Sequence, residues 1–211
     1  MVKTAVLVSG GGTNLQAIID AHIFGEIKNC ELAAVISSKP DAYALTRAKS
    51  AGIPTYIVER KVFANRASFS EAVHKMLEGL DIELVVLAGF MYVLDPPLVK
   101  AYKNRIINIH PSLIPSFCGD GFYGLRVHAA ALAYGAKVSG ATAIFCTNET
   151  DGGPIICQKA VEVLESDTPA TLQQRIMEDA EWKILPEAIS LFCEGRLEVV
   201  GRTVHIKEAS E

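Results

Sequence analysis

The sequence lacks the features that define several large protein classes. Its five cysteines are odd in number and include no Cys-x-x-Cys pair, which argues against a zinc ribbon and against a disulfide framework. No apolar run approaches the roughly 20 residues of a membrane span. The formal net charge is −4, so no global basic field would draw the chain to nucleic acid or to an anionic membrane. We therefore expect a reduced, cytoplasmic protein without a metal site, a nucleic-acid partner or a membrane segment.

What is present indicates one globular domain. The chain has 211 residues, enough for one substantial core, and half of them are hydrophobic while 21% are charged. The sequence shows no internal repeat, low-complexity segment or interdomain linker. We expect a single domain over residues 1–211.

Apolar runs of strand length alternate with helical patterns through the first half of the chain. The expected strands are 5–8, 32–36, 55–58 and 84–88, and the expected helices between them are 14–22, 42–51 and 68–80. Continuous apolar strands separated by helices predict a parallel sheet that is covered on both faces. Right-handed crossovers would make this α/β sheet doubly wound and Rossmann-like.

The second half predicts an antiparallel edge for this mostly parallel sheet. The expected elements are a short helix 95–102, a fifth strand 106–109, a loop 111–125, a helix 126–134 and two strands 140–146 and 155–163. The two strands flank a turn and should form an antiparallel pair at the sheet edge. A long helix should begin at Asp167 or Thr168 and run toward Cys193. A hairpin of 197–200 and 203–206 should follow, with a frayed tail 207–211.

A glycine-rich turn, SGGGTN at 9–14, follows the first strand and opens the first helix. Glycines let the backbone approach a ligand closely, and a helix start offers unpaired N–H groups and a positive dipole end. Thr13 or Asn14 should cap the helix and also donate. The dinucleotide fingerprint fails because Leu15 stands three residues after Gly12, and no Gly-Lys-Ser/Thr follows. The turn therefore predicts a phosphate site, with a merely flexible connection as the alternative.

Two polar residues stand at the end of the fifth strand. Side chains alternate along a strand, so Asn108 and His110 should share one face while Ile109 points into the packing. Pro111 biases His110 toward extended geometry and ends the strand. Ligands of open α/β sheets bind at the carboxyl ends of strands, which favours a functional pair. The alternative is a histidine with a structural role.

Asp151 lies in a DGGP segment, which is first of all a turn signal. It could nevertheless reach His110, hold the imidazole tautomer and favour the protonated ring. Asn108 would supply an amide donor for a developing oxyanion. The sequence has no Gly-x-Ser-x-Gly elbow, and Cys118 lies in an aromatic loop, which disfavours a cysteine acyl enzyme. An amide, an imidazole and a carboxylate without a nucleophile suit direct acyl or formyl transfer, in which the substrate amine attacks.

Four segments in chain order resemble the phosphoribosylglycinamide formyltransferase family. They are SGGGTNLQAI at 9–18, LAGFM at 87–91, NIHPSLIP at 108–115 and DGGPII at 151–156. The Asn-x-His plus Asp set is shared by a wider formyltransferase superfamily, so it specifies the chemistry better than the substrate. The glycine-rich turn, the Asn-Leu-Gln helix start and the single-domain length favour the glycinamide member.

The resemblance implies an enzyme of purine synthesis that uses 10-formyltetrahydrofolate as formyl donor and needs no metal. It implies a phosphate-binding half at 1–105, a catalytic and folate-binding half at 106–195, and a hairpin and tail at 196–211. The implied residues for the phosphoribosylglycinamide substrate are Gly12, Thr13, Asn14, Glu178 and Glu181. The implied folate-binding residues are Arg66, Met91, Tyr92, Val93, Leu94 and Asn108.

Two of these assignments carry expectations about geometry. Glu178 and Glu181 should lie one turn apart on one helix face, at the ribose and glycinamide end; for Glu178, a solvated helix face is the alternative. Backbone groups of 91–94 should bind the pteridine while the apolar side chains pack on it. The chain departs from the family pattern at 116–126, a longer loop, and at Arg126, where many members carry His; His128 is retained. Arg126 would either add positive charge for phosphate or folate glutamate, or be a surface cation.

The implied mechanism is attack of the glycinamide amine on the formyl carbon. Asn108 and protonated His110 would stabilise the oxyanion, while Asp151 would sustain the charge on His110 and order a proton-shuttling water. A methionyl-tRNA formyltransferase would normally add a carboxyl-terminal domain, and a formyltetrahydrofolate hydrolase an amino-terminal one. A sugar-nucleotide formyltransferase and a non-catalytic folate or nucleotide binder remain alternatives. We expect small-molecule substrates and a monomer or homodimer.

Overall fold

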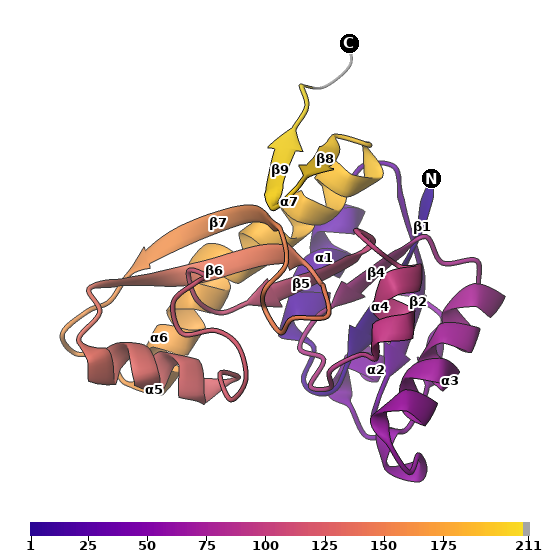
Figure 1. Ribbon diagram of the computed structural model, residues 1–211, viewed down its shortest axis with the longest axis horizontal. Helices are drawn as coiled ribbons and strands as arrows, with labels where there is room; N and C mark the ends of the chain where they lie inside the picture. Colours follow the sequence, from indigo (N-terminus) through magenta and orange to yellow (C-terminus); the bar gives the residue numbers. More distant parts are fainter. Residues whose placement is uncertain (209–211) are drawn as a thin grey trace.

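A mostly parallel sheet runs through the molecule in the computed structural model, which describes residues 1–208 (Figure 1). Its nine strands are β1 (Val2–Val8), β2 (Cys30–Ser37), β3 (Thr55–Ile57), β4 (Leu84–Leu87), β5 (Ile106–His110), β6 (Val138–Phe145), β7 (Ile155–Glu162), β8 (Leu197–Val200) and β9 (Thr203–Ile206). The strand order is β3-β2-β1-β4-β5-β6-β7-β9-β8. The neighbouring strands β3, β2, β1, β4 and β5 all pair in parallel. Strand β6 pairs antiparallel with β5, and β7 pairs antiparallel with β6. The predicted α/β class and mostly parallel sheet are confirmed.

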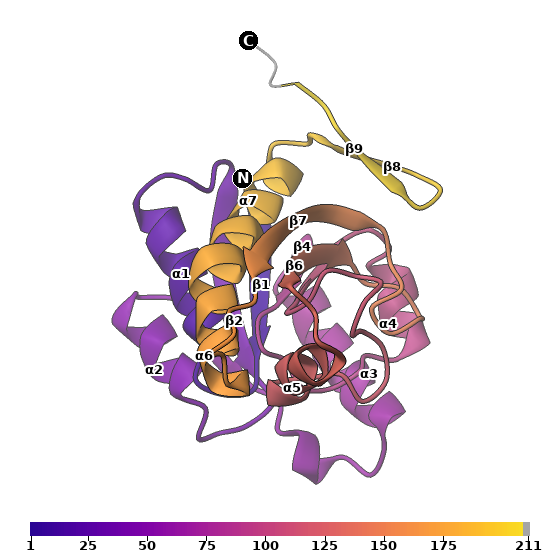
Figure 2. The ribbon, with the colours of Figure 1, turned by 90° about the vertical axis from the view of Figure 1, so that its left-hand side faces the viewer.

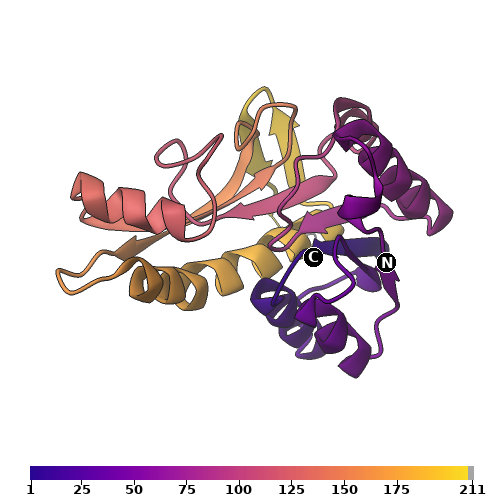
Figure 3. The same cartoon turned by 90° about the horizontal axis from the view of Figure 1, so that it is seen from below.

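Helices cover both faces of the sheet, as predicted. They are α1 (Thr13–Ile23), α2 (Tyr43–Ser50), α3 (Arg66–Gly79), α4 (Pro96–Ala101), α5 (Leu125–Tyr134), α6 (Pro169–Ile176) and α7 (Trp182–Cys193), with a 3-10 turn η1 (Arg60–Val62) and a π-helical segment η2 (Met177–Glu181). One core lies between the sheet and α1, α2 and α7, and the other lies against α3 and α4. Figures 2 and 3 show these two helical layers on opposite sides of the strands. None of the helices within 1–208 is both long enough and apolar enough to cross a membrane.

The central strands explain why two cores form. In β1, Val6 and Val8 belong to the core under α1 and α7, while Ala5 and Leu7 belong to the core under α3 and α4. Successive side chains point to opposite faces, so a strand buried on both faces must be apolar throughout. Because β1, β4 and β5 are parallel neighbours, the loops that follow them emerge together at the carboxyl edge of the sheet.

The antiparallel edge differs from the prediction in its outermost strand. The β6–β7 pair is antiparallel as expected, but β9 and β8 continue the sheet beyond it. The hairpin attaches to β7 through the single residue pair Ile155 and Thr203. The expected frayed tail is wrong at Lys207, whose amide donates to the Arg196 carbonyl at 2.8 Å. Residues 209–211 of that tail lie outside the described residues.

The predicted long helix after Thr168 is interrupted. Thr168 caps α6 through the Thr171 amide, and Pro169 occupies the first turn. The π-helical segment Met177–Glu181 then separates α6 from α7. Pro186 lies inside α7, and a proline has no N–H and clashes with the carbonyl four residues before it. The carbonyl four residues before Pro186 is that of Trp182, which follows directly on the π-helical segment.

Candidate active site

Ser9 joins two of the loops at the carboxyl edge of the sheet. Its hydroxyl accepts a hydrogen bond from the Met91 amide at 3.1 Å and lies 2.7 Å from the Ser38 hydroxyl. Ser9 is 2% exposed, so these bonds are shielded from water. They fix the glycine-rich turn after β1 against the segment that follows β4.

The glycine-rich turn is shaped by close contact with α2. Gly12 has a φ of +74°, and a Cβ there would lie 2.7 Å from the Ala44 Cβ, so a larger residue would meet both strain and overlap. The Gly10 carbonyl accepts from the Ala44 amide at 3.0 Å. The Gly11 carbonyl accepts from Arg47 Nε at 2.9 Å. These bonds turn two carbonyls of the turn toward α2.

The first turn of α1 leaves its amides free. Gln16 donates to the Gly12 carbonyl at 2.9 Å, whereas the amides of 12–15 have no hydrogen-bond partner in the described chain. Unpaired N–H groups and the positive end of the helix dipole together form an anion site. A second feature is a cavity of about 350 Å³ beside this turn, lined in part by Thr13, Arg47 and Trp182.

The expected capping role of Thr13 and Asn14 is wrong. Gly12 is the N-cap and no side chain caps α1, because both polar side chains point away from the helix start. Thr13 Oγ1 lies 3.8 Å from Met177 Sδ. Asn14 Nδ2 donates to Glu181 Oε2 at 2.7 Å, which joins α1 to the π-helical segment.

Glu178 and Glu181 do not share a helix face. Glu181 is 5% exposed, while Glu178 is exposed and its Oε1 accepts from Gln174 Nε2 at 2.9 Å. The π-helical segment spreads its hydrogen bonds over five residues, so a spacing of three no longer completes a turn. Burial raises the pKa of the Glu181 carboxyl to about 7, against the opposing hydrogen bond from Asn14. Of the two, Glu181 is the one that contacts the start of α1, through Asn14.

The structure brings Asn108, His110 and Asp151 to one place. Asn108 pairs with Ile144 of β6, and His110 pairs with Thr142. His110 is 4% exposed, and its Nδ1 lies 3.4 Å from Asp151 Oδ2. This arrangement offers an amide donor and an imidazole–carboxylate pair at the end of β5.

The turn that carries Asp151 depends on one glycine. Asp151 itself has a φ of +53°, a conformation that Asp tolerates better than most residues. A Cβ at Gly153 would overlap the Phe145 carbonyl, so this position requires glycine. The Phe145 amide donates to the Pro154 carbonyl at 2.9 Å and closes the turn. In this turn Asp151 lies beside His110 at the end of β5.

The implied folate segment is only partly available as a side-chain surface. Met91 is 54% and Val93 is 52% exposed, whereas Leu94 is 6% exposed and belongs to the core under α3 and α4. At this segment Leu94 thus faces the core, while Met91 and Val93 present apolar side chains at the surface. Tyr92 lies edge-on to Phe69, with ring centroids 5.8 Å apart. Packing of this segment against α3 explains both results.

Arg66 and Arg126 are both exposed cations. The Arg66 side chain is 54% exposed, and its Nε lies 3.4 Å from Asp95 Oδ1. Arg126 lies over the Tyr123 ring, with its guanidinium carbon 4.8 Å from the ring centroid. Arg66 thus stands beside the 91–94 segment. Arg126 lies in the first turn of α5 and packs on Tyr123 of the preceding loop.

Two titratable residues near the trio are poor candidates for chemistry. Burial, followed by the charges of Asp151 and Glu149, raises the pKa of the Cys118 thiol, which disfavours the thiolate that a cysteine nucleophile needs. Burial, followed by the nearby His110, lowers the pKa of His128 to about 4, so this ring is neutral at pH 7. In residues 1–208, no cluster of three or more His, Cys, Asp and Glu side chains is placed to hold a metal ion.

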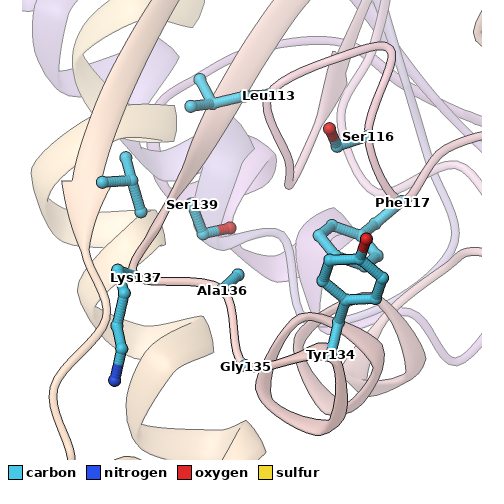
Figure 4. A pocket seen from close by; sticks show the side chains of 9 residues that line it. Leu113, Ser116, Phe117, Tyr134, Gly135, Ala136, Lys137 and Ser139 are labelled. Atoms are coloured by element: carbon cyan, nitrogen blue, oxygen red, sulfur yellow. The ribbon is translucent and has the colours of Figure 1, made fainter.

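A separate cavity of about 460 Å³ lies next to the loop after β5 (Figure 4). Its lining is Leu113, Ser116, Phe117, Tyr134, Gly135, Ala136, Lys137, Val138 and Ser139, and it includes none of the trio. Figure 4 shows Phe117 and Tyr134 side by side on one wall, with the Ser139 hydroxyl across from them. The cavity therefore borders the loop after β5 through Ser116 and Phe117, and the Phe117 carbonyl contacts His110.

Two buried polar residues near the trio have no strong sequence signal. Ser112 and Thr142 are each 0% exposed and are linked by a 2.6 Å hydrogen bond from Thr142 Oγ1 to the Ser112 carbonyl. Ser112 lies in the NIHPSLIP segment, which was the one available hint. Thr142 lies in an apolar strand and was not distinguishable from a packing residue.

Comparisons with known proteins agree with this geometry. A family model described as formyl transferase matches residues 2–189. The phosphoribosylglycinamide formyltransferase of Haemophilus influenzae is 42% identical over 197 residues, which are 93% of this chain and 90% of that protein. The trifunctional purine biosynthetic protein adenosine-3 of Gallus gallus is 41% identical over 94% of this chain. The chain spans about a fifth of that longer relative, 19% of its length.

Solved structures give the same result. The crystal structure of glycinamide ribonucleotide transformylase 1 from Symbiobacterium toebii superposes with a TM-score of 0.92 at 45% identity. The match covers 99% of this chain and 95% of the other. The similarity therefore includes the sheet, the loops at its carboxyl edge and the helices that flank them.

Proposed function

The chain belongs to the formyl transferase family, and from this premise we propose that it is a phosphoribosylglycinamide formyltransferase of purine biosynthesis. It transfers the formyl group of 10-formyltetrahydrofolate to the amine of 5′-phosphoribosylglycinamide. The similarity to proteins of that name over nearly the whole chain supports the acceptor. The exposed side chains of Met91 and Val93, in a segment beside Arg66, support a folate as the donor.

The observation that carries the proposal is the His110–Asp151 pair beside Asn108. The Asp151 carboxylate lies 3.4 Å from the ring, the imidazole supplies an N–H donor, and the amide of Asn108 adds a second donor. Both groups suit a tetrahedral oxyanion, whose stabilisation is commonly the largest catalytic term in acyl transfer. The high pKa of the Cys118 thiol supports direct attack by the substrate amine rather than a covalent intermediate.

The reaction would proceed in two bond changes. The amine nitrogen attacks the formyl carbon, and the former carbonyl oxygen becomes an oxyanion bound by Asn108 and protonated His110. A water held by Asp151 takes a proton from the attacking nitrogen and delivers it to folate N10. The bond between the formyl carbon and N10 then breaks, and the carbonyl reforms on the glycinamide nitrogen.

The opposite end of the site supports a phosphorylated acceptor. The free amides at the start of α1 suit phosphate oxygens, and the carbonyls of Gly10 and Gly11 are turned away from them. Asn14 and Glu181 lie beside this turn and supply an amide and a buried carboxyl for the ribose or glycinamide groups. The proposal gives Glu178 a peripheral contact, because its side chain is exposed.

A substrate panel tests the function. Purified protein is incubated with 10-formyltetrahydrofolate and either 5′-phosphoribosylglycinamide or a sugar-nucleotide amine, and the formylated products are measured by mass spectrometry. Formylation of phosphoribosylglycinamide supports the proposal. Formylation of only the sugar nucleotide would make the chain a sugar-nucleotide formyltransferase, ligand binding without turnover would make it a binder, and release of formate alone would make it a hydrolase.

The proposal extends to the setting of the enzyme. We infer small-molecule substrates, no nucleic-acid or membrane partner, a cytoplasmic location and a monomer or homodimer. The net charge of −4 supports the absence of a nucleic-acid partner. Analytical ultracentrifugation with and without substrates would distinguish the two assembly states.

A further inference from the structure

The two ring nitrogens of His110 face different kinds of partner. Nε2 lies 2.9 Å from the carbonyl oxygen of Phe117, within the usual range of an N–H···O hydrogen bond. Nδ1 lies 3.4 Å from Asp151 Oδ2, beyond that range. A carbonyl oxygen can only accept, so Nε2 must carry a hydrogen in this arrangement. The neutral ring is then the Nε2–H tautomer, and Nδ1 gains and loses the second proton.

This assignment changes the role expected of Asp151. From the sequence, Asp151 was to hold the tautomer of His110. Its carboxylate oxygen instead accepts a 3.0 Å hydrogen bond from the Gly119 amide and lies at longer distance from the ring. The shorter bond to Phe117 therefore orients the imidazole, and Asp151 stands beside the nitrogen that exchanges its proton.

The Phe117 carbonyl reaches His110 through an uncommon backbone conformation. Phe117 has a φ of +50°, which is rare for a bulky residue and persists only where the surroundings hold it. Its ring lies edge-on to Phe122 and to Tyr134, with centroids 6.4 and 5.9 Å away. Figure 4 shows the Phe117 and Tyr134 rings against each other on the cavity wall. Ring packing thus holds one side of this residue.

Ser112 holds the other side. Its hydroxyl donates to the Ser116 carbonyl at 2.6 Å and lies 3.4 Å from the Phe117 carbonyl. The Ser116 carbonyl belongs to the peptide directly before Phe117, so this bond sets the plane from which Phe117 turns back. Ser112 is 0% exposed, and no water competes for its hydroxyl.

The position of Ser112 is in turn set by the sheet. Thr142 Oγ1 on β6 donates to the Ser112 carbonyl at 2.6 Å and accepts from the Ile114 amide at 3.1 Å. Gln158 Nε2 on β7 donates to the same Thr142 oxygen and to the Ile114 carbonyl, both at 3.0 Å. The hydroxyl of Thr142 uses its one donor and both acceptor sites. A continuous hydrogen-bonded chain therefore runs from β7 to the His110 ring.

We propose that Ser112 is a positioning residue that fixes the Nε2–H tautomer of His110 through the Phe117 carbonyl. His110 Nδ1 is then the nitrogen that donates to the formyl oxygen and faces Asp151. The proposal rests on the proposed function for the identity of the reaction. Its structural part, the tautomer, stands independently of which substrate is used.

The tautomer can be read directly by nitrogen NMR. The full-length protein is labelled with ¹⁵N-histidine, and His110→Gln identifies the His110 signals. When the ring is neutral, we expect Nε2 to be protonated and Nδ1 to be bare in the wild type. Ser112→Ala should give a mixture of tautomers, and Ser112→Thr, which keeps the hydroxyl, should restore the wild-type pattern. A wild-type ring that carries its hydrogen on Nδ1 would overturn the proposal, even if Ser112→Ala failed to fold.

Ser139→Ala is the matched control. Ser139 is also a buried serine close to the loop, at 3% exposure, but its hydroxyl has no hydrogen-bond partner within 1–208. We expect this variant to keep the wild-type tautomer and turnover. An equal disturbance of His110 in Ser112→Ala and Ser139→Ala would show a general packing effect and contradict the proposal.

Kinetics supply the second readout. We expect Ser112→Ala to lower kcat roughly ten- to hundredfold, less than the 10²–10⁴ that positioned proton transfer contributes in full. The KM values should change by less than about twofold, because Ser112 is fully buried and offers no surface to a substrate. A rise in KM at constant kcat would contradict the positioning role. Wild-type protein without formyl transfer would reject the proposed function but leave the NMR result valid.

Discussion

The side-chain amide of Asn14 donates a 2.7 Å hydrogen bond to Glu181 Oε2, joining residues 167 positions apart in the chain. Asn14 lies in the first turn of α1, and Glu181 ends the π-helical segment. The Asn14 Oδ1 atom is buried and has no partner among the residues that the structure describes. An unsatisfied buried oxygen next to the glycine-rich turn calls for a donor, and under the proposed function a substrate hydroxyl or amine would supply one.

Glu181 should make stability depend on pH. Its carboxyl has a folded pKa of about 7 against an ordinary value of 4.5, so the native state binds more protons than the unfolded chain between these values. Stability should therefore fall as the pH rises from 4.5 to 7, by roughly 3 kcal/mol at most. Glu181→Gln removes this term. Urea denaturation of both proteins at several pH values measures it, and parallel stability curves would contradict the assignment.

Loss of either oxyanion donor should reduce turnover strongly. We expect Asn108→Ala and His110→Ala each to lower kcat by about 10²–10³, the usual cost of removing one such donor. Circular dichroism and thermal unfolding should show an intact fold for both variants. Steady-state assays with phosphoribosylglycinamide measure the effect, and near-normal kcat in a folded variant would remove that residue from the mechanism.

Asp151→Asn should separate chemistry from binding. Asparagine tolerates the positive φ of this position and can still accept from the Gly119 amide, so the turn should survive. The negative charge beside His110 is lost, and kcat should fall while the affinity for the phosphorylated acceptor is kept. Isothermal titration calorimetry provides the affinity. Weakened binding in proportion to kcat would instead indicate that Asp151 only shapes the site.

Gly12→Ala should destabilise the fold more than Gly11→Ala. An alanine at position 12 would adopt a strained φ and overlap Ala44, whereas no atom lies within 4 Å of a Cβ at Gly11. Overlap and backbone strain of this kind cost about 1–3 kcal/mol. Chemical denaturation of the two variants gives the difference. Equal stabilities would mean that α1 and α2 can shift apart at little cost.

Local pattern was sufficient for the architecture and for two residues of the trio. Alternating apolar runs and helical segments required a parallel sheet covered on both faces, because each strand had to be buried twice. Two-residue periodicity placed Asn108 and His110 on one side of β5. The family was indicated by four segments whose sequences resemble formyltransferases, and neither periodicity nor spacing would have named it.

Side-chain partners that are distant in the sequence were decided by the tertiary structure. Asp151 meets His110 from the turn between β6 and β7, where Gly153 packs against the Phe145 carbonyl. Glu178 and Glu181 lie in different environments because the chain forms a π-helical segment at 177–181, which the periodicity of an α-helix does not anticipate.

The hydrogen-bond partner of His110 Nε2 was equally hidden. It is a backbone carbonyl, and every residue type carries one, so sequence identity says nothing about where it points. The sequence by itself thus determined which chemical groups are present and on which elements they lie. The tertiary structure alone decided which nitrogen of His110 is held and which is left to react, because that choice depends on distances between chain segments that only packing brings together.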